Sequence, residues 1–364
     1  MTSPTFLMPD LVVASTLNQA IARTSVFQDT QTRRHFLHAF GCGVVGAVMS
    51  RKLLRAAASQ HDFVDVHYHV TTSAMRAMAN NAGVSALPEW TAARAIEAMD
   101  HDGIATSVIS MPVMATQMPG GEEQHRNHAR QSNEESARIV AANPTRFRFF
   151  ATTALPYVDA ALAEIAYALD SLKADGVYMC TSYGDKWLGD PAFKPVMEEL
   201  NRRGAVVFTH PMGAACCVSL ERDVPVQVIE YGTDTTRTIA SLIFSGTAHK
   251  FPRIRFLFSH SGGTAPYLFE RFNIESQQHK DAVPEGAIAL MQKFYYDTAI
   301  SANPYALGDL IKLVPRSQIL FGSDSPWGEP GAQLKAIDGL GLDADMVAAI
   351  RGNNARQLLP DLRA

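Results

Sequence analysis

The sequence predicts an α/β fold, and within that class a (β/α)₈ barrel, also called a TIM barrel. Two observations predict it. From residue 61 onward, short apolar runs rich in β-branched and aromatic residues recur along the chain, as expected of parallel strands that are buried on both faces. Longer stretches whose apolar residues have helical spacing separate these runs. The alternation repeats eight times, which is the number of strand-helix units that closes a barrel.

The predicted strands are the eight apolar runs, each followed by polar or turn-forming residues. The runs are nearly continuous in hydrophobicity, whereas a strand with one wet face alternates between apolar and polar residues. In chain order the predicted strands span residues 63–66, 104–110, 147–153, 176–180, 205–209, 254–259, 294–297 and 318–321.

The predicted helices lie between these runs, and several carry start or stop signals. Thr91 is a capping residue before one helix, and Asn143-Pro144 stops the next one. Pro191 falls in the first turn of another helix, which Gly204 closes. The predicted helices span residues 91–101, 133–142, 158–173, 190–203, 234–249, 265–279, 304–314 and 343–359.

A doubly wound open sheet is the alternative architecture for alternating strands and helices. That fold normally carries a glycine-rich turn after its first strand, and no such turn follows residues 63–66. The sequence shows no domain boundary, low-complexity tract or longer repeat after residue 61. We therefore expect a single barrel domain over residues 61–364.

Residues 1–58 have the features of an export signal and leader. Arg33 and Arg34 precede an almost uncharged apolar run over residues 39–49, and three alanines follow at 56–58. This order is typical of a secretory signal, and the arginine pair resembles a twin-arginine signal. The run is too short for a stable membrane anchor. We expect export to the periplasm; a cytoplasmic protein with a chance arginine pair is the alternative.

The composition argues against several kinds of partner. Of the 364 residues, 47% are hydrophobic and 19% are charged, which allows a sizeable core. The formal net charge is −4, so nothing points to nucleic acid or an anionic membrane surface as a partner. The four cysteines form no C-x-x-C pair, so neither a zinc ribbon nor a thioredoxin-like site is indicated.

Histidine and aspartate residues follow four of the predicted strands. The first strand runs into His67 and His69, the fifth into His210, the sixth into His260 and the eighth into Asp324. The carboxyl ends of barrel strands meet at one face, so these side chains are expected at one mouth. Residues i and i+2 of a strand point the same way, roughly 7 Å apart. Three imidazoles with one carboxylate suit zinc, are compatible with iron or manganese, and leave room for water or substrate.

Each of these residues has an ordinary explanation when it is taken alone. Most His-x-His pairs are surface or core histidines, and a single histidine such as His210 is more often structural. Asp324 alone could be a turn residue before Ser325-Pro326. The joint placement at the ends of separate strands argues against chance, and it predicts a metal centre at the mouth of the barrel.

The chain from about Phe63 to Leu359 resembles the amidohydrolase-2 branch of the amidohydrolase superfamily, whose fold is the metal-dependent hydrolase type of TIM barrel. This branch includes the aminocarboxymuconate-semialdehyde and hydroxybenzoate decarboxylases. The matching segments are residues 65–69 (Asp-Val-His-Tyr-His), 207–211 (Val-Phe-Thr-His-Pro), 258–263 (Phe-Ser-His-Ser-Gly-Gly) and 320–326 (Leu-Phe-Gly-Ser-Asp-Ser-Pro).

The resemblance implies a role for each residue at the strand ends. His67, His69, His210 and Asp324 would be metal ligands, and His260 would stand beside the metal-bound water or substrate as a polarising or proton-transfer group. Many binuclear members carry a lysine at the end of strand four. The fourth strand here, residues 176–180, has none, so we expect one divalent metal, zinc first and manganese as the alternative.

Two reactions and one non-catalytic role stay open at this point. In a decarboxylase of a small aromatic or unsaturated acid, Asp324 would protonate the carbon that loses CO₂, and His260 would orient it or share the role. In a hydrolase of a C–N, lactone or ester bond, metal-activated water would be the nucleophile. The segment over residues 230–237 resembles decarboxylases of salicylate-like acids, which favours the first reaction. A metal- or ligand-binding module without catalysis is the third alternative.

Two residues are candidate substrate contacts. Arg237 falls in the first turns of the helix predicted after the fifth strand and could clamp a carboxylate with two hydrogen bonds. A salt bridge with Asp234 or Glu230 is the alternative for Arg237. Trp327 follows the eighth strand and Trp187 the fourth, where they could stack on an aromatic substrate or pack against the protein.

The remaining expectations concern the loop after the second strand and the partners. Residues 112–128 include His125, Arg126 and His128, and we expect a solvated loop there that covers the site. A small-molecule carboxylic acid is the expected substrate, and a homo-oligomer, most simply a dimer, is the expected assembly.

Overall fold

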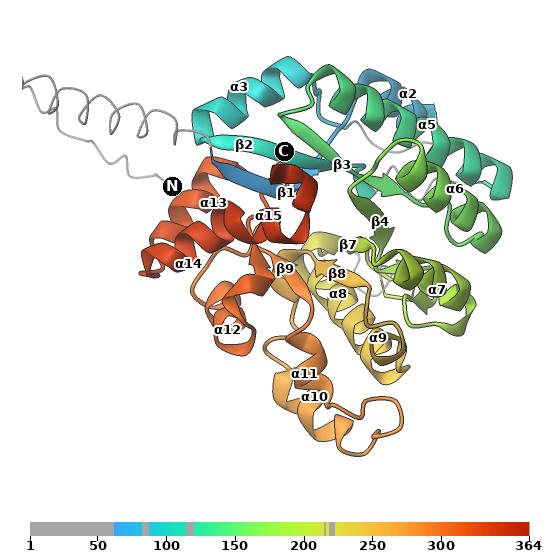
Figure 1. The fold of residues 1–364 in the computed structure, drawn as a ribbon, viewed down its shortest axis with the longest axis vertical. Helices are drawn as coiled ribbons and strands as arrows, with labels where there is room; N and C mark the ends of the chain where they lie inside the picture. The colour runs from blue at the N-terminus through green and yellow to red at the C-terminus, as the bar shows by residue number, and fades with distance from the viewer. Residues whose placement is uncertain (1–61, 82–86, 114–119, 215, 218–222, 364) are drawn as a thin grey trace, which may run out of the picture. The chain divides into compact units, whose positions relative to one another are not determined.

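The computed structural model describes residues 62–81, 87–113, 120–214, 216–217 and 223–363. The predicted export signal and leader, residues 1–58, lie outside these ranges. In the described part of the chain, eight parallel strands form one sheet in the order β1-β2-β3-β4-β7-β8-β9-β10. Figure 1 shows helices on the outside of this sheet. The predicted (β/α)₈ barrel is confirmed.

The barrel strands coincide with the predicted apolar runs. β1 continues to His69 and β7 to His210, past the predicted ends, because these last residues still pair with Ser110 of β2 and Cys180 of β4. The strands are β1 (Phe63–His69), β2 (Ile104–Ser110), β3 (Phe147–Thr152), β4 (Gly176–Cys180), β7 (Val206–His210), β8 (Arg255–Phe258), β9 (Tyr295–Asp297) and β10 (Ile319–Leu320).

Backbone hydrogen bonds close the barrel between its last strand and its first. Val66 N donates to Phe321 O at 3.0 Å, and His69 N donates to Ser325 O at 2.7 Å. Asp324 N donates to His67 O at 2.9 Å. The seam of the barrel therefore joins the first histidine motif to the residue that carries the candidate carboxylate ligand.

Helices follow the strands, and their caps match the signals in the sequence. Thr91 Oγ1 accepts a hydrogen bond from Arg94 N at the start of α3, and Gly204 ends α7 in the left-handed conformation, at φ 62°. No helix among the described residues is both long and apolar enough to span a membrane. The helices are α2 (Ser73–Asn81), α3 (Ala92–Asp102), α5 (Glu122–Ala142), α6 (Val158–Asp170), α7 (Lys194–Arg203), α8 (Val226–Phe244), α9 (Thr247–Lys250), α10 (Phe269–Ser276), α11 (Ala287–Met291), α12 (Ala306–Leu313), α13 (Pro330–Asp338), α14 (Ala344–Ala348) and α15 (Asn354–Leu358).

The predicted start of the helix after the fifth strand is wrong. Asp234 has the character of a helix cap in the sequence, but it lies inside α8, which begins at Val226. Its fully buried carboxylate accepts hydrogen bonds from Trp187 Nε1 at 2.7 Å, from Ser182 Oγ at 3.1 Å and from Thr181 Oγ1. Asp234 thus fixes α8 to the segment after β4, which contains a short hairpin, β5 (Ser182–Tyr183) and β6 (Lys186–Trp187).

Other helix boundaries also differ from the prediction. α5 begins at Glu122, ahead of the predicted start at residue 133, and α10 begins at Phe269. The stretch predicted as one helix over residues 343–359 is divided by a π-helical turn, Ala349–Asn353. The sequence analysis also missed α2, α11 and α13.

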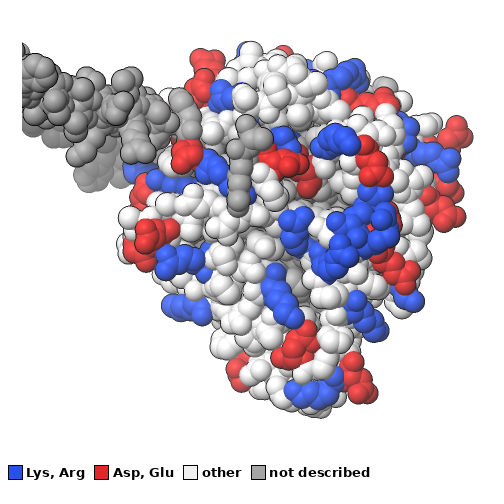
Figure 2. Space-filling view, viewed as in Figure 1, with Lys and Arg blue, Asp and Glu red and all other residues white. Residues whose placement is uncertain are grey.

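The last helices cover the end of the barrel where the strands begin. Arg356 of α15 lies 2.5 Å from Asp62, just before β1, and Arg255 at the start of β8 donates to Leu358 O at 2.7 Å. In Figure 1 the C-terminus and α15 accordingly lie over β1. Figure 2 shows basic and acidic side chains interspersed on this face. One ion pair, Arg203 with Asp170 at 2.7 Å, joins α7 to α6.

Candidate metal centre and active site

Four buried side chains meet where β1, β7 and β10 end. His67 and His69 come from β1, His210 is the last residue of β7, and Asp324 follows β10. The ligand atoms of these four residues all lie within 4.8 Å of one another. The structure therefore brings together the four residues that the sequence proposed, and their assignment as metal ligands stays a prediction.

Each histidine ring at the mouth has its Nδ1 against an oxygen atom of the protein. The pairs are His67 Nδ1 with Asp297 Oδ2 at 2.8 Å, His69 Nδ1 with Met111 O at 3.1 Å, His210 Nδ1 with Pro211 O at 2.7 Å and His260 Nδ1 with Ala299 O at 2.9 Å. Because these oxygen atoms accept, Nδ1 carries the hydrogen in the neutral ring and Nε2 keeps its lone pair for the centre. The rings are thus oriented for ligation through Nε2.

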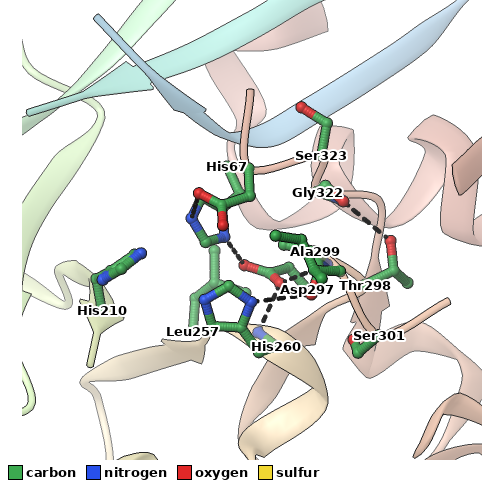
Figure 3. A network of polar contacts seen from close by, with 12 residues as sticks. His67, His210, Leu257, His260, Asp297, Thr298, Ala299, Ser301, Gly322 and Ser323 are labelled. Atoms are coloured by element: carbon green, nitrogen blue, oxygen red, sulfur yellow. Dashed lines mark hydrogen bonds and ion pairs between the residues drawn. The ribbon is translucent and has the colours of Figure 1, made fainter. Parts of the chain in front are cut away.

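Asp297, the last residue of β9, is a functional candidate that the sequence analysis missed. One carboxylate oxygen contacts His67 Nδ1, and the other accepts hydrogen bonds from His260 N and Ala299 N, both at 2.9 Å. Figure 3 shows Asp297 between His67 and His260. The signal was present in the sequence, since Asp297 is the charged end of an otherwise apolar strand, but its partners are far away along the chain.

Burial and neighbouring charges set the protonation of these groups when no metal ion is bound. Burial alone would lower the pKa of the His67 imidazole, but the carboxylates of Asp297 and Asp324 raise it to about 10. Burial lowers the pKa of His69, and burial together with the nearby histidines lowers that of His210 strongly. Burial would raise the pKa of Asp324, but His67 and His69 hold it well below its usual range. The site therefore favours an ionised Asp324 and neutral His69 and His210.

Unusual backbone conformations concentrate at the mouth. Five non-glycine residues in the described part of the chain have a positive φ, and four of them lie near the centre. They are His260 and Ser261, both at 55°, Ile300 at 47° and Asp324 at 62°. Such conformations cost roughly 1–3 kcal/mol each and persist where the surrounding structure imposes them. Here the contacts of Asp297 with His260 N and of His67 O with Asp324 N impose two of them.

A cavity of about 430 Å³ opens above the four clustered side chains. His69, His210, His260 and Asp324 line its inner end. His260 Nε2 is buried and, among the described residues, has no hydrogen-bond partner. The aromatic ring of Tyr231, from the second turn of α8, also lines the cavity and lies 5.7 Å from the ring of His210. The described lining residues include no lysine or arginine.

Of the three candidate substrate contacts, one lines the cavity and two do not. Arg237 does not line the cavity; its guanidinium lies 3.3 Å from Glu230 Oε2, which is the salt-bridge alternative. Trp187 is held by Asp234 and does not line the cavity either. Trp327 does line it, and its ring lies 5.5 Å from that of His69. The carboxylate clamp predicted for Arg237 therefore has no geometric support, whereas Trp327 lies where a substrate would contact it.

The segment after β2 is partly helical. His125, Arg126 and His128 belong to α5, and His128 is buried. The predicted loop is wrong for these residues because they belong to a long helix, but Arg126 is exposed on that helix, with 58% of its side chain accessible. Of the described residues in this segment, Pro112 and Val113, which are the nearest to β2, line the cavity.

The whole barrel matches a known family. The family model described as "Amidohydrolase" matches residues 64–360. The chain belongs to the amidohydrolase family. This amidohydrolase is 31% identical over 313 residues to a 6-methylsalicylic acid decarboxylase of Penicillium expansum, with 82% of this chain and 97% of the relative covered. It is 35% identical over 288 residues to the decarboxylase macB of Penicillium terrestre, with 72% and 84% covered.

Solved structures share the fold of this amidohydrolase at lower identity. The dihydroxybenzoic acid decarboxylase of Polaromonas, solved with bound manganese and the inhibitor 2-nitroresorcinol, aligns with a TM-score of 0.74 and 20% identity. The alignment covers 84% of this chain and 98% of that one. At this identity the likeness supports the fold.

Three of the four donor atoms of this amidohydrolase, from His67, His69 and Asp324, have the spacing of ligands to one divalent metal, and the His210 donor lies within 4.8 Å of them. Tetrahedral ligands at zinc-like distances of 2.0–2.1 Å stand about 3.3 Å apart. The observed separations are 3.1 Å between His67 Nε2 and His69 Nε2, 3.1 Å from His69 Nε2 to Asp324 Oδ1 and 3.3 Å from His67 Nε2 to the same oxygen. Imidazole and carboxylate suit zinc as well as manganese.

Proposed function

We propose that this amidohydrolase is a metal-dependent, non-oxidative decarboxylase whose substrates are 2-hydroxybenzoates of the 6-methylsalicylate type. The observation that carries the proposal is the cavity, in which the donor cluster meets largely apolar walls without a described lysine or arginine. A substrate with one carboxylate and an apolar ring suits such walls. The names of the relatives at 31% and 35% identity agree with this chemistry.

The metal would be held by His67, His69, His210 and Asp324. When bound, it would supply positive charge that stabilises an anionic substrate. With this charge at the inner end, the proposed reaction would need no arginine clamp. Zinc is our first choice for the metal, and the manganese in the Polaromonas structure makes manganese the alternative.

Asp324 and His260 would handle the protons. His260 Nδ1 donates to Ala299 O, so Nε2, which has no hydrogen-bond partner among the described residues, accepts the phenolic proton and returns it to the product. Asp324 Oδ1 faces His67 and His69, which leaves Oδ2 for proton transfer. Because Asp324 is ionised at rest, Oδ2 first takes up a proton from solvent water and then passes it to the substrate. The ring carbon gains this proton, the bond to the carboxylate carbon breaks, and its electron pair restores the aromatic ring.

Trp327 and Tyr231 would position the aromatic ring. Both side chains line the cavity, and their rings lie 5.5 Å from the ring of His69 and 5.7 Å from the ring of His210, respectively. Burial raises the pKa of Tyr231 to about 12, so its phenol stays neutral at physiological pH and would be able to donate a hydrogen bond to the substrate.

Product analysis tests the reaction directly. Protein loaded with Zn²⁺ or Mn²⁺ is incubated with 6-methylsalicylate in D₂O, and CO₂ and 3-methylphenol are measured. We expect equal amounts of both, with one deuteron at the ring position that lost the carboxylate. Absence of both products across a panel of 2-hydroxybenzoates, with hydrolysis of a lactone or aryl ester instead, would replace decarboxylation by the hydrolase alternative. If neither reaction occurs while metal binds, the chain is a binding module.

We further propose that residues 1–58 direct export and that the mature protein is a homodimer. The arginine pair before an apolar run supports export. Cell fractionation of the natural protein and of a variant with Arg33→Lys and Arg34→Lys tests it; a natural protein that stays in the cytoplasm contradicts the proposal. Sedimentation of the purified protein tests the assembly, and a monomer at micromolar concentration contradicts a stable dimer.

A further inference from the structure

Three apolar side chains form an open rim around the cavity. Val228 of α8, Ile300 after β9 and Trp327 after β10 all line it, and they are 70%, 60% and 42% exposed. They come from three separate elements, so one amphipathic pattern does not explain them. Solvent-exposed apolar side chains that converge on one opening are typical of a ligand-binding surface.

Ile300 shows that the rim is not a by-product of folding. Its φ is 47°, a conformation that glycine or asparagine adopts readily and that is an outlier for a β-branched residue. Its backbone N–H donates to Gln333 Oε1 at 2.8 Å, and Gln333 Nε2 in turn donates to Ser323 O, next to Asp324. The fold therefore maintains a strained conformation that presents an apolar side chain to the cavity, which points to function.

The cavity is larger than the proposed substrate core. At roughly 20 Å³ for each bonded non-hydrogen atom at close packing, the eleven such atoms of 6-methylsalicylate fill about 220 Å³. The cavity measures about 430 Å³, so about half of it stays unfilled. The buried donors His69, His210 and Asp324 lie at the inner end, whereas Val228, Ile300 and Trp327 are exposed at the opening. The unfilled half therefore adjoins these three apolar side chains.

We infer that this rim is a subsite for an alkyl chain, and that the preferred substrates are 2-hydroxybenzoates with an apolar substituent several carbon atoms long at position 6. The carboxylate and phenol occupy the inner end, and the chain runs outward along the rim. The unfilled volume accommodates about eight carbon atoms at liquid-like packing. The inference rests on the proposed function, because it assumes that the inner end binds the hydroxybenzoate head.

The test is a chain-length series. Metal-loaded protein is assayed with 2-hydroxybenzoates that carry methyl, propyl, pentyl or heptyl at position 6, and the Kd of each is measured by titration calorimetry. Full burial strengthens binding about fourfold per methylene group; because the rim is open on one side, we expect about twofold. From methyl to pentyl, kcat/KM should therefore rise at least tenfold, through KM. A flat or falling series in protein that decarboxylates 6-methylsalicylate overturns the subsite and leaves the proposed function standing.

Variants locate the effect. Val228→Ser and Ile300→Ser should each reduce the pentyl-to-methyl ratio of kcat/KM at least threefold. Tyr267→Ser is the matched control, because Tyr267 is 79% exposed and does not line the cavity; its ratio should equal that of the natural protein. A ratio that is unchanged in both rim variants overturns the inference. If no member is turned over, a Kd that falls with chain length keeps the subsite and rejects the reaction, whereas a constant Kd overturns both.

Discussion

Asp297 Oδ2 lies 2.8 Å from His67 Nδ1, and both side chains are fully buried. A carboxylate in this position fixes the tautomer of a ligating imidazole and raises the electron density on its Nε2. The same carboxylate accepts the backbone N–H of His260. One residue that touches neither the cavity nor the cluster centre therefore orients both a candidate ligand and the candidate proton acceptor.

Replacing this carboxylate should weaken metal binding. We expect Asp297→Asn to lower the affinity for Zn²⁺ about 10- to 100-fold, the usual effect of losing such a partner. The measurement is competition against a chelating dye at constant pH. Asp309→Asn, which changes an exposed carboxylate on α12, is the matched control. An unchanged Zn²⁺ affinity for Asp297→Asn would show that Asp297 is only a structural residue.

The sequence allowed the donor cluster to be predicted because strand ends are easy to recognise. A continuous apolar run followed by histidine or aspartate fixes both the element and its end, and the closed barrel brings the ends together. Asp297 obeys the same rule, but its role depends on contacts with His67 and His260, which lie 230 and 37 residues away. The order of strands around a barrel predicts which strands are adjacent, but it does not predict which side chains form hydrogen bonds with each other.

The first residues of the helices were harder to predict than the ends of the strands. α8 begins eight residues ahead of Asp234, because tertiary contacts with Thr181, Ser182 and Trp187 outweigh the capping preference of aspartate. This shift moves Arg237 from the first turn to about 16 Å along the helix axis. The strained conformation of Ile300 had no signal either, since nothing in the sequence marks a β-branched residue for a positive φ.

Metal binding should release one proton at pH 8. Without metal, the raised pKa of His67, about 10, keeps its ring protonated at that pH, while His69 and His210, whose pKa values are lowered, are already neutral. A metal needs the Nε2 lone pair of His67, so this ring loses its proton. Below pH 10 the affinity for the metal should rise about tenfold per pH unit. Above pH 10 metal binding should no longer release this proton.

Titration calorimetry in buffers with different ionisation enthalpies counts this proton. The expected slope of observed enthalpy against buffer enthalpy at pH 8 corresponds to one proton per Zn²⁺. A slope of zero would mean that His67 is neutral before the metal binds and that the carboxylates of Asp297 and Asp324 do not raise its pKa above 8.

Asp324→Asn should abolish turnover. The amide removes both an anionic ligand and the proposed proton donor, and loss of a proton-transfer group alone lowers kcat about 10²- to 10⁴-fold. Metal content by mass spectrometry, measured alongside kcat at saturating Zn²⁺, separates the two effects. A variant that holds a full equivalent of metal and is still inactive identifies Asp324 as the proton donor. Activity equal to that of the natural protein contradicts the assignment.

Ile300→Gly should stabilise the fold although it removes an apolar side chain. The side chain is 60% exposed, so little buried surface is lost, and glycine adopts a φ of 47° without strain. Relief of roughly 1–3 kcal/mol of strain against about 1 kcal/mol of added chain entropy should raise the free energy of unfolding by about 1 kcal/mol. Urea unfolding of the metal-loaded protein measures it. A loss of more than about 1 kcal/mol would show that the conformation is not strained in its surroundings.

Arg237→Gln should leave the reaction almost unchanged. The guanidinium pairs with Glu230 at 3.3 Å and does not line the cavity, and the pair is partly exposed, so its loss costs at most about 1 kcal/mol of stability. We expect kcat/KM for 6-methylsalicylate within about threefold of the natural value, since no substrate contact is removed. Steady-state kinetics at saturating metal gives the comparison, with Trp327→Ala as the variant that should raise KM. A KM increase of a hundredfold in Arg237→Gln would mean that the arginine leaves Glu230 and reaches the substrate carboxylate, which is one of the two alternatives that the sequence left open.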